Sequence, residues 1–271
     1  MSLDTHTAAG APALPSLRER RRAAASQEIV SAAESHITEH GPAGLSLRAV
    51  ARGLGMTVQA LYHYFPNRDA LITALITKAY DELADAVQAA VDDAATDRAG
   101  PPGLVAAAEG YRRWAIAHPE RFQLLYGTPL RHYAAPAGGP TTQAVRRMSG
   151  IFQRELFAGF STAQLAGADA PELSPALRAH LAELPPDGLG ELPPPATALL
   201  LGAWGHMHGL VVLEVFGHTE FLGDHQAEVF RTAMQTLLQD VRTRIPTTPA
   251  APPAPRSADE PPGAGGRPHV G

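Results

Sequence analysis

The stretch from residue 45 to residue 71, LSLRAVARGLGMTVQALYHYFPNRDAL, constrains the fold more than any other part of the chain. Ser46, Thr57 and Asn67 are residue types that start helices, because their side-chain oxygens accept hydrogen bonds from free N–H groups of the first turn. Gly55 lies where a first helix would end, since glycine adopts the left-handed conformation of a helix end without strain. The pattern predicts two short helices joined by a tight turn, followed by a third helix.

A helix, a short turn containing glycine and a second short helix form the helix-turn-helix plan, whose second helix enters the major groove of DNA. The expected second helix stops at Pro66, and Leu61 and Phe65 can anchor it to a core. Its other faces carry uncharged donors and acceptors, suited to phosphates and base edges. A plain helical hairpin would leave these aromatic rings exposed without a partner. The expected DNA contacts are Ser46, Arg48, Thr57, Val58, Gln59, Tyr62, His63, Tyr64 and Arg68.

This stretch resembles the DNA-binding domain of the TetR/AcrR family of bacterial transcriptional regulators. The resemblance covers roughly residues 20 to 75, and its most specific part is the LYxYF core, followed three residues later by a basic residue. The sequence departs from the usual pattern at Ala60, where many members have glycine, and at Arg68, where lysine is commoner. Neither departure conflicts with a helix, and Arg68 keeps the positive charge.

Charge is distributed unevenly along the chain, whose formal net charge is −5. Residues 16 to 78 hold eight basic and five acidic side chains, a net charge of +3; residues 79 to 245 hold 12 basic and 19 acidic ones, a net charge of −7. A basic head on an acidic body favours contact with DNA at one end only. The run Arg18, Arg20, Arg21 and Arg22 fits a solvated helix start, but before a helix-turn-helix we expect it to contact phosphates.

Composition narrows the chemistry of the chain. The absence of cysteine excludes disulfides, thiol redox chemistry and Cys-type zinc sites, and it fits a cytoplasmic protein. His36 and His40 lie one helical turn apart, but no third ligand is evident near them, so we expect no metal. No nucleophile elbow, HExxH, phosphate-binding loop or dinucleotide motif occurs, so we expect neither an enzyme nor a cofactor.

The apolar periodicity predicts an all-α chain, with a three-helix helix-turn-helix head and a helical body. Helices are expected over about 20–40, from 67 to about 94, from 104 to a break at Pro119, over a short segment after that proline, and over 141–160. The proline-rich region 161–194 is expected to hold at most one short helix, near residues 176–184. The expected division is a disordered tail over 1–16, a DNA-binding domain over 17–78, a connector near 96–103, a body over 104–245 and a disordered tail over 246–271.

Residues 196 to 216, ATALLLGAWGHMHGLVVLEVF, form the most apolar stretch and carry no charge before Glu214. A membrane span is the alternative reading, but histidines lie in its middle and no basic clusters flank it. A helix that is apolar all round is otherwise buried on all sides. We therefore expect this helix and a final helix over 221–245 to form a homodimer interface, with Leu210 and Val211 between the subunits.

The body resembles the WHG type of TetR-family C-terminal domain, through Trp204, His208 and Gly209 in GAWGHMHGLVVLEVFGH and through YRRWAIAHPERFQLLYGTP. This resemblance implies a helical dimer with a four-helix interface and a pocket inside each subunit. Aromatic residues of the body are candidates to line that pocket. An equally simple interpretation is that they fill the core. The candidates are Tyr111, Trp114, His118, Phe122, Tyr126, Phe152, Trp204 and His208.

The favoured hypothesis is a homodimeric transcriptional regulator, a repressor that a small-molecule effector releases from a near-palindromic double-stranded operator. An activator or a ligand-blind regulator fits the same sequence. A third hypothesis is a helical small-molecule binding protein or enzyme with a vestigial DNA-binding head. Such a head would have lost its exposed Tyr62, His63 and Tyr64 and its Arg68, which are all present.

Overall fold

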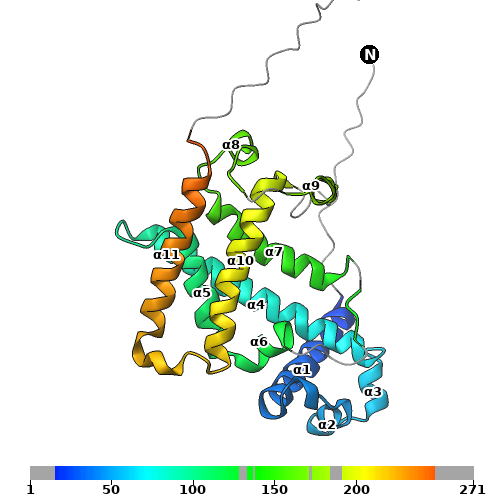
Figure 1. The fold of residues 1–271 in the computed structure, drawn as a ribbon. Coiled ribbons are helices and arrows are strands. Elements are labelled where there is room, and N and C mark those ends of the chain that lie inside the picture. Colours follow the sequence, from blue (N-terminus) through cyan, green and yellow to red (C-terminus); the bar gives the residue numbers. More distant parts are fainter. Residues whose placement is uncertain (1–15, 128–132, 137, 171–172, 184–190, 248–271) are drawn as a thin grey trace, which may run out of the picture.

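The computed structural model describes residues 16–127, 133–136, 138–170, 173–183 and 191–247 (Figure 1). The tails expected to be disordered, 1–16 and 246–271, lie outside these residues except at their inner ends. The described residues are helical and contain no strand, as the all-α prediction required. Their α-helices are α1 (Leu17–His40), α2 (Leu47–Gly53), α3 (Val58–Tyr62), α4 (Arg68–Thr96), α5 (Gly103–Ala117), α6 (Pro119–Tyr126), α7 (Pro140–Leu156), α8 (Thr162–Ala166), α9 (Pro175–Ala182), α10 (Pro194–Val215) and α11 (Gln226–Arg244).

The head is built by α1, α2, α3 and the first part of α4, with a core of aliphatic side chains. Ile29, Leu61, Leu71 and Ile72 are fully buried at the centre of this core. Buried residues recur at three- and four-residue spacings along the longer helices, as Ile29, Ala33 and Ile37 do on α1, so each of these helices turns one apolar stripe inward. The head therefore has a hydrophobic core of its own.

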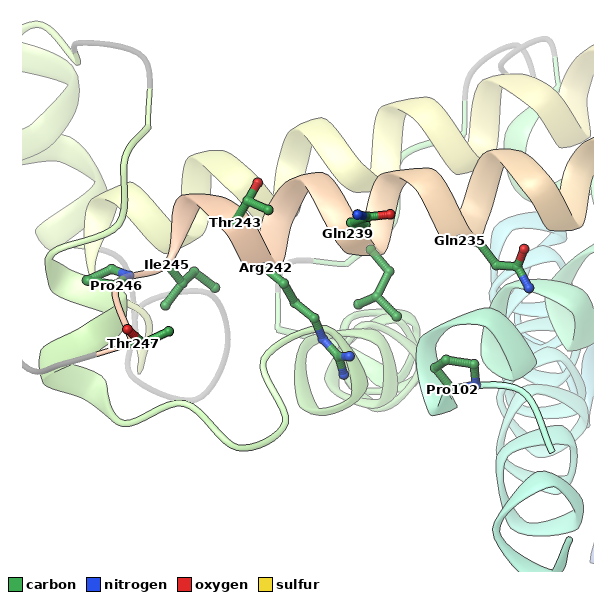
Figure 2. Close-up of a pocket in the computed structure, with 9 residues that line it drawn as sticks. Pro102, Gln235, Gln239, Arg242, Thr243, Ile245, Pro246 and Thr247 are labelled. Atoms are coloured by element: carbon green, nitrogen blue, oxygen red, sulfur yellow. The ribbon is translucent and has the colours of Figure 1, made fainter. Parts of the chain in front are cut away.

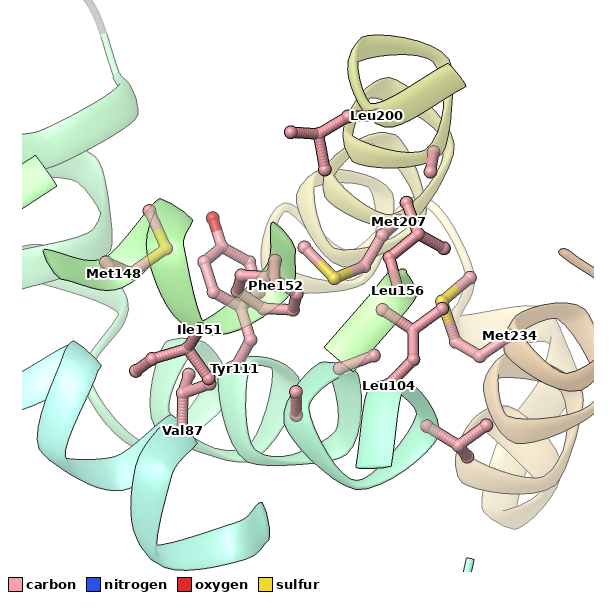
Figure 3. Packing of buried hydrophobic residues seen from close by; sticks show 14 of the residues in the cluster. Val87, Leu104, Tyr111, Met148, Ile151, Phe152, Leu156, Leu200, Met207 and Met234 are labelled. Atoms are coloured by element: carbon pink, nitrogen blue, oxygen red, sulfur yellow. The ribbon is translucent and has the colours of Figure 1, made fainter. Parts of the chain in front are cut away.

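The body packs the rest of α4 along α5 and α7, with α10 and α11 covering the other side of α5 (Figure 1). Gly110 allows α4 and α5 to approach closely, because a Cβ there would lie 2.8 Å from the Cβ of Ala90 and 3.1 Å from the carbonyl oxygen of Ala86. Figure 3 shows Val87 of α4 beside Ile151 of α7 and close to Tyr111 of α5. The long helix α4 thus belongs to both cores, which meet between Ile76 and Ala79.

Two expectations for the body are wrong in detail. Region 161–194 contains α8 as well as α9; Ser161 and Gln164 form a reciprocal capping box at the start of α8, a local signal that the many prolines obscured. The last α-helix begins at Gln226 rather than 221, because the residues before it form a 3₁₀ segment, Glu220–His225, which is kinked at Gly223 with a φ of +53°.

The apolar helix α10 is long enough to cross a membrane by length and composition, and 39% of its most apolar window is buried in the subunit. A single helix of this kind is weak evidence for a span, since core helices pass the same test. Val211 is completely buried against its own subunit and Leu210 partly so. The expectation that Val211 lies between subunits is therefore wrong, because a different face of α10 is exposed.

Candidate nucleic-acid interface and the ring cluster of the body

The helix-turn-helix of the head is fixed by local hydrogen bonds. The Thr57 hydroxyl accepts from the backbone N–H of Ala60 at 3.1 Å, and the Asn67 side chain accepts from that of Ala70 at 2.8 Å. Gly55 follows α2 with a φ of +65°, where a side chain would be strained. These contacts fix the end of α2 and the starts of α3 and α4.

The helix α3 buries Leu61 completely, and Val58 is partly buried against the head core. Phe65, just beyond the helix, also packs there. The opposite side is exposed, and Tyr62 has a side chain 40% accessible to solvent. The exposed residues at and beside α3 are Thr57, Gln59, Tyr62 and His63.

The remaining predicted DNA contacts differ in how free their side chains are. Ser46 uses its hydroxyl to accept from the N–H of Ala49 at 3.4 Å, so it serves as the cap of α2. Arg48 is exposed on α2. Arg68 is half-buried at the first residue of α4 and forms no hydrogen bond or ion pair with any described residue. The two arginines can therefore reach a phosphate, whereas Ser46 is engaged within the head.

Arg22 is distinct from the other arginines at the start of α1. Its guanidinium donates to the carbonyl oxygen of His63 at 2.9 Å and lies over the ring of Tyr64, 5.9 Å from its centroid. A cation favours the carbonyl end of a helix. Arg22 thus holds the end of α3 in place, whereas Arg20 and Arg21 are exposed and have no side-chain partner among the described residues.

An ion-pair network joins the head to the body. Glu34 of α1 is buried and pairs with Lys78 of α4, which lies 3.1 Å from Glu82; Arg121 of α6 pairs with Glu82 and lies 4.0 Å from Glu34. Partial burial lowers the pKa of Lys78, but hydrogen bonds to Glu34 and Glu82 outweigh it and hold this pKa above its ordinary value. Beside the network, Leu124 of α6 reaches into the head core. The helix α6 therefore contacts both parts of the molecule.

Six of the eight predicted pocket residues form one group in the body, which we call the ring cluster. The Trp204 and His208 rings are stacked at 5.4 Å and 11°, and Tyr126 lies 4.6 Å from His208. Tyr80 of α4 also belongs, 5.9 Å from Tyr126, although its place in a long helix gave no signal that it would. The cluster consists of Tyr80, Tyr111, Phe122, Tyr126, Phe152, Trp204 and His208. The other two candidates, Trp114 and His118, form a separate ring pair at 5.2 Å.

The polar atoms of the ring cluster are few and uncharged. The Tyr111 hydroxyl and the Nδ1 of His208 share a hydrogen bond of 2.8 Å. Burial raises the pKa values of the Tyr80, Tyr111 and Tyr126 hydroxyls and lowers that of His208, so all four side chains are neutral near pH 7. The buried Tyr126 hydroxyl has no hydrogen-bond partner in the described residues. Tyr80 and Tyr111 lie close enough to influence the pKa of Tyr126, but neither hydroxyl meets the geometry of a hydrogen bond to it.

Two other hollows lie outside the ring cluster. A cavity of about 20 Å³, room for about one water molecule, adjoins the ring cluster at Phe152 and Trp204. An open groove of about 700 Å³ lies between the C-terminal half of α11 and Pro102, with Arg242 extending into it (Figure 2). No group of three or more His, Asp or Glu side chains in the described part of the chain could hold a metal ion.

A helix-turn-helix with one exposed face, carried on a helical body, defines a DNA-binding transcriptional regulator. Two family models match the chain: "Bacterial regulatory proteins, tetR family" over residues 29–75, and "Tetracyclin repressor-like, C-terminal domain" over residues 104–237. The chain belongs to the TetR family of bacterial transcriptional regulators.

Individual relatives agree with this assignment. The chain is 41% identical over 138 residues to the HTH-type transcriptional regulator Rv1816 of Mycobacterium tuberculosis; the match covers 51% of this chain and 58% of that protein, less than two thirds of its length. The crystal structure of the protein SCO4313 is 31% identical, with a TM-score of 0.64, and the match covers 83% of this chain and 100% of the other. A protein of unknown function from Rhodococcus sp. RHA1 is 25% identical, with a TM-score of 0.56, covering 80% and 94% of the two chains.

Proposed function

We propose that this regulator is a cytoplasmic homodimeric repressor that binds a near-palindromic operator and leaves it when a small molecule enters the body. The observation that carries the DNA-binding part is the two-sided character of α3. Leu61 is fully buried on one side, while Gln59, Tyr62 and His63 are exposed on the other. Exposed amide, phenol and imidazole groups on a firmly held helix suit the reading of base edges and phosphates.

The dimer proposal rests on an exposed stripe along α10. Leu201, Leu213 and Phe216 are between 42% and 49% exposed, which is unusual for large apolar side chains on one helix. Gly202, Gly205 and Gly209 lie on the same stripe, and a Cβ at each would meet nothing within 4 Å in its own subunit. Glycine inside a helix costs about 1 kcal/mol relative to alanine. Because the subunit does not need these glycines, their use favours close approach of α10 from a second copy.

Gly205→Leu tests the dimer against a matched control. Sedimentation should detect monomers of Gly205→Leu under conditions in which the wild-type protein is dimeric, because the added side chain fills the space that the second copy would occupy. Gly150→Leu is the control, since Gly150 is also an exposed helical glycine with open space around it, but on α7. A dimeric Gly205→Leu variant with unchanged stability would contradict the proposed interface.

Effector release is supported by the position of α6 between the two cores. Phe122 and Tyr126 of this helix belong to the ring cluster, Leu124 packs in the head core, and Arg121 bonds with the network around Glu34. A molecule that changed the packing of the rings would act on the head through the same short helix. Release requires that the effector prefer the conformer that does not fit DNA.

The function is tested by selecting genomic fragments with the purified full chain. A near-palindromic fragment should be enriched, and its affinity should fall steeply with salt, because arginines displace counterions from phosphates. Gln59→Ala should alter the preferred base at some positions of the operator without changing the fold, because Gln59 is exposed. No enrichment of any fragment, or an affinity that does not change with salt, would refute the function.

A further inference from the structure

The ring cluster has no countercharge for an ionised ligand. Among the described residues, no charged side chain forms a hydrogen bond, ion pair or cation–π contact with its rings. Its polar groups are the three phenols and the imidazole described above, together with the indole N–H of Trp204. Burying an ion without a partner is costly, whereas burying a neutral ring beside other rings is favourable. The cluster therefore selects against charged molecules.

Within the described part of the chain, one buried polar atom of the cluster lacks a partner. The Tyr126 hydroxyl is buried without a hydrogen bond, while the Tyr111 hydroxyl is already engaged with His208. Buried hydroxyls are almost always hydrogen-bonded, because an unmade bond costs free energy. A phenol donates readily, so the complementary group on a ligand is a hydrogen-bond acceptor such as a carbonyl oxygen.

Space for a ligand can come from flexible side chains next to the rings. Met207 and Met234 line the small cavity together with Phe152 and Trp204, and Figure 3 shows both methionines between α10 and α11 beside Leu156. Methionine is unbranched and adapts its conformation to fill or vacate irregular gaps. Trp204 is itself only partly buried, so the cluster extends to the surface of the subunit. The existing cavity holds only about one water molecule, so even a ligand of one ring requires the methionines to move.

We propose that the effector is a small, neutral, single-ring molecule whose acceptor oxygen takes the hydrogen bond of Tyr126. This proposal rests on the ligand-responsive function proposed above and specifies the chemical class of the ligand. The ring would pack edge-to-face or offset against Trp204 and Phe152, in the geometry those rings already use with each other, 5.8 Å apart at 71°. The methionines would move to accommodate it.

Three probe molecules of similar size test separately whether the ligand is neutral and whether it needs an acceptor oxygen. Their affinities for the wild-type full chain are measured by isothermal titration calorimetry. Acetophenone is neutral and has an acceptor, toluene is neutral without one, and benzoate is an anion at neutral pH. Acetophenone should bind about fivefold more tightly than toluene, and benzoate at least about tenfold more weakly than acetophenone. Benzoate binding as tightly as acetophenone would overturn the neutral-ligand proposal, and equal binding of acetophenone and toluene would overturn the role of the acceptor.

Two variants test whether the Tyr126 hydroxyl is the group that donates to the ligand's acceptor oxygen. Tyr126→Phe should lower the affinity for acetophenone about fivefold and leave that for toluene unchanged, while the melting temperature without ligand stays equal or rises. Tyr133→Phe is the control, because the Tyr133 hydroxyl bonds to Thr73 at 3.2 Å, away from the ring cluster. A Tyr126→Phe variant that keeps its full affinity for acetophenone would show that another group binds the oxygen.

Measuring operator binding alongside probe binding distinguishes failure of this ligand inference from failure of the proposed function. If none of the probes binds while operator DNA is still bound with a steep salt dependence, the inference about the ligand is wrong and the regulator function stands. If acetophenone binds as expected but no operator is found or no release occurs, the ligand class stands and the proposed function fails.

Discussion

The head and the body of this regulator begin their helices in different ways. Each of the four helices that build the head starts with a side-chain cap, from Ser16, Ser46, Thr57 and Asn67. In the body, α5, α6, α7, α10 and α11 start without a side-chain cap, while the short peripheral helices α8 and α9 have one, from Ser161 and Ser174. The short helices α2 and α3 cannot bury enough surface to form without local help, whereas the body helices are stabilised mainly by packing on one another.

The aromatic residues of the two parts are also placed oppositely. Near α3 of the head, Tyr62 and His63 face outward and can meet a macromolecule; in the body, Tyr111, Phe122 and Trp204 face one another. The comparison separates two kinds of recognition within one chain. The head offers a preformed exterior surface, whereas the body offers an interior that must rearrange to admit a ligand.

The largest effect is expected where the body depends on packing alone. Val211→Glu would bury an unpaired charge at a fully buried position and should cost several kcal/mol of folding free energy, enough to abolish folding of the body. Leu213→Glu, two residues along at a position 43% exposed, should leave the subunit folded and weaken the dimer instead. Urea denaturation and sedimentation distinguish the two, and similar unfolding of both variants would contradict the assignment of faces on α10.

The reliance of the head on caps gives a smaller effect. Asn67→Ala removes an acceptor 2.8 Å from the N–H of Ala70 and should lower stability by about 1 kcal/mol. His225→Ala, at the uncapped start of α11, should change it by less than about 0.5 kcal/mol. Denaturant unfolding of both variants compares the two parts directly. Equal losses would break the contrast between capped head and packed body.

Arg68 tests whether a residue that is unfavourable for the fold serves DNA binding. A cation at the first residue of α4 opposes the helix dipole by about 0.3–1 kcal/mol, so Arg68→Ala should leave stability equal or slightly higher. Operator affinity should fall similarly for all sequences, and the salt slope should drop by about one unit. Arg113→Ala, an exposed arginine of the body, is the control and should change neither quantity. A lower melting temperature with intact DNA affinity would make Arg68 structural.

The smallest expected effect concerns pH. Burial lowers the pKa of His208 below its ordinary 6.5, so the folded body binds this proton less readily than the unfolded chain does. His208 therefore contributes stability that is present above about pH 6.5 and is lost as the pH falls toward the folded-state pKa. In a plot of melting temperature against pH, His208→Gln should flatten the fall on the acid side. His206→Gln, at an exposed position two residues away, should not. Identical acid slopes for the wild type and His208→Gln would contradict this origin.

The difference between the locally capped head and the packed body also explains how much of each could be predicted from the sequence. Ser46 and Gly55 bound α2 and Thr57 starts α3, as the sequence predicted, but α3 ends at Tyr62 rather than just before Pro66, so the expected end of that helix is wrong. The sequence also determined that the chain is all-α and that its most apolar helix is α10. Local hydrogen bonds and apolar periodicity act over short distances, and a single sequence therefore carries them.

Only the tertiary structure decided which residues meet. Arg22 lies 41 positions before the His63 carbonyl that it holds, and Tyr111 lies 97 positions before His208. The helix α10 is apolar all round, so its periodicity could not tell the buried face of Val211 from the exposed glycine stripe. Contacts between distant helices depend on how several apolar faces are satisfied at once, and this condition is met only when the whole chain packs.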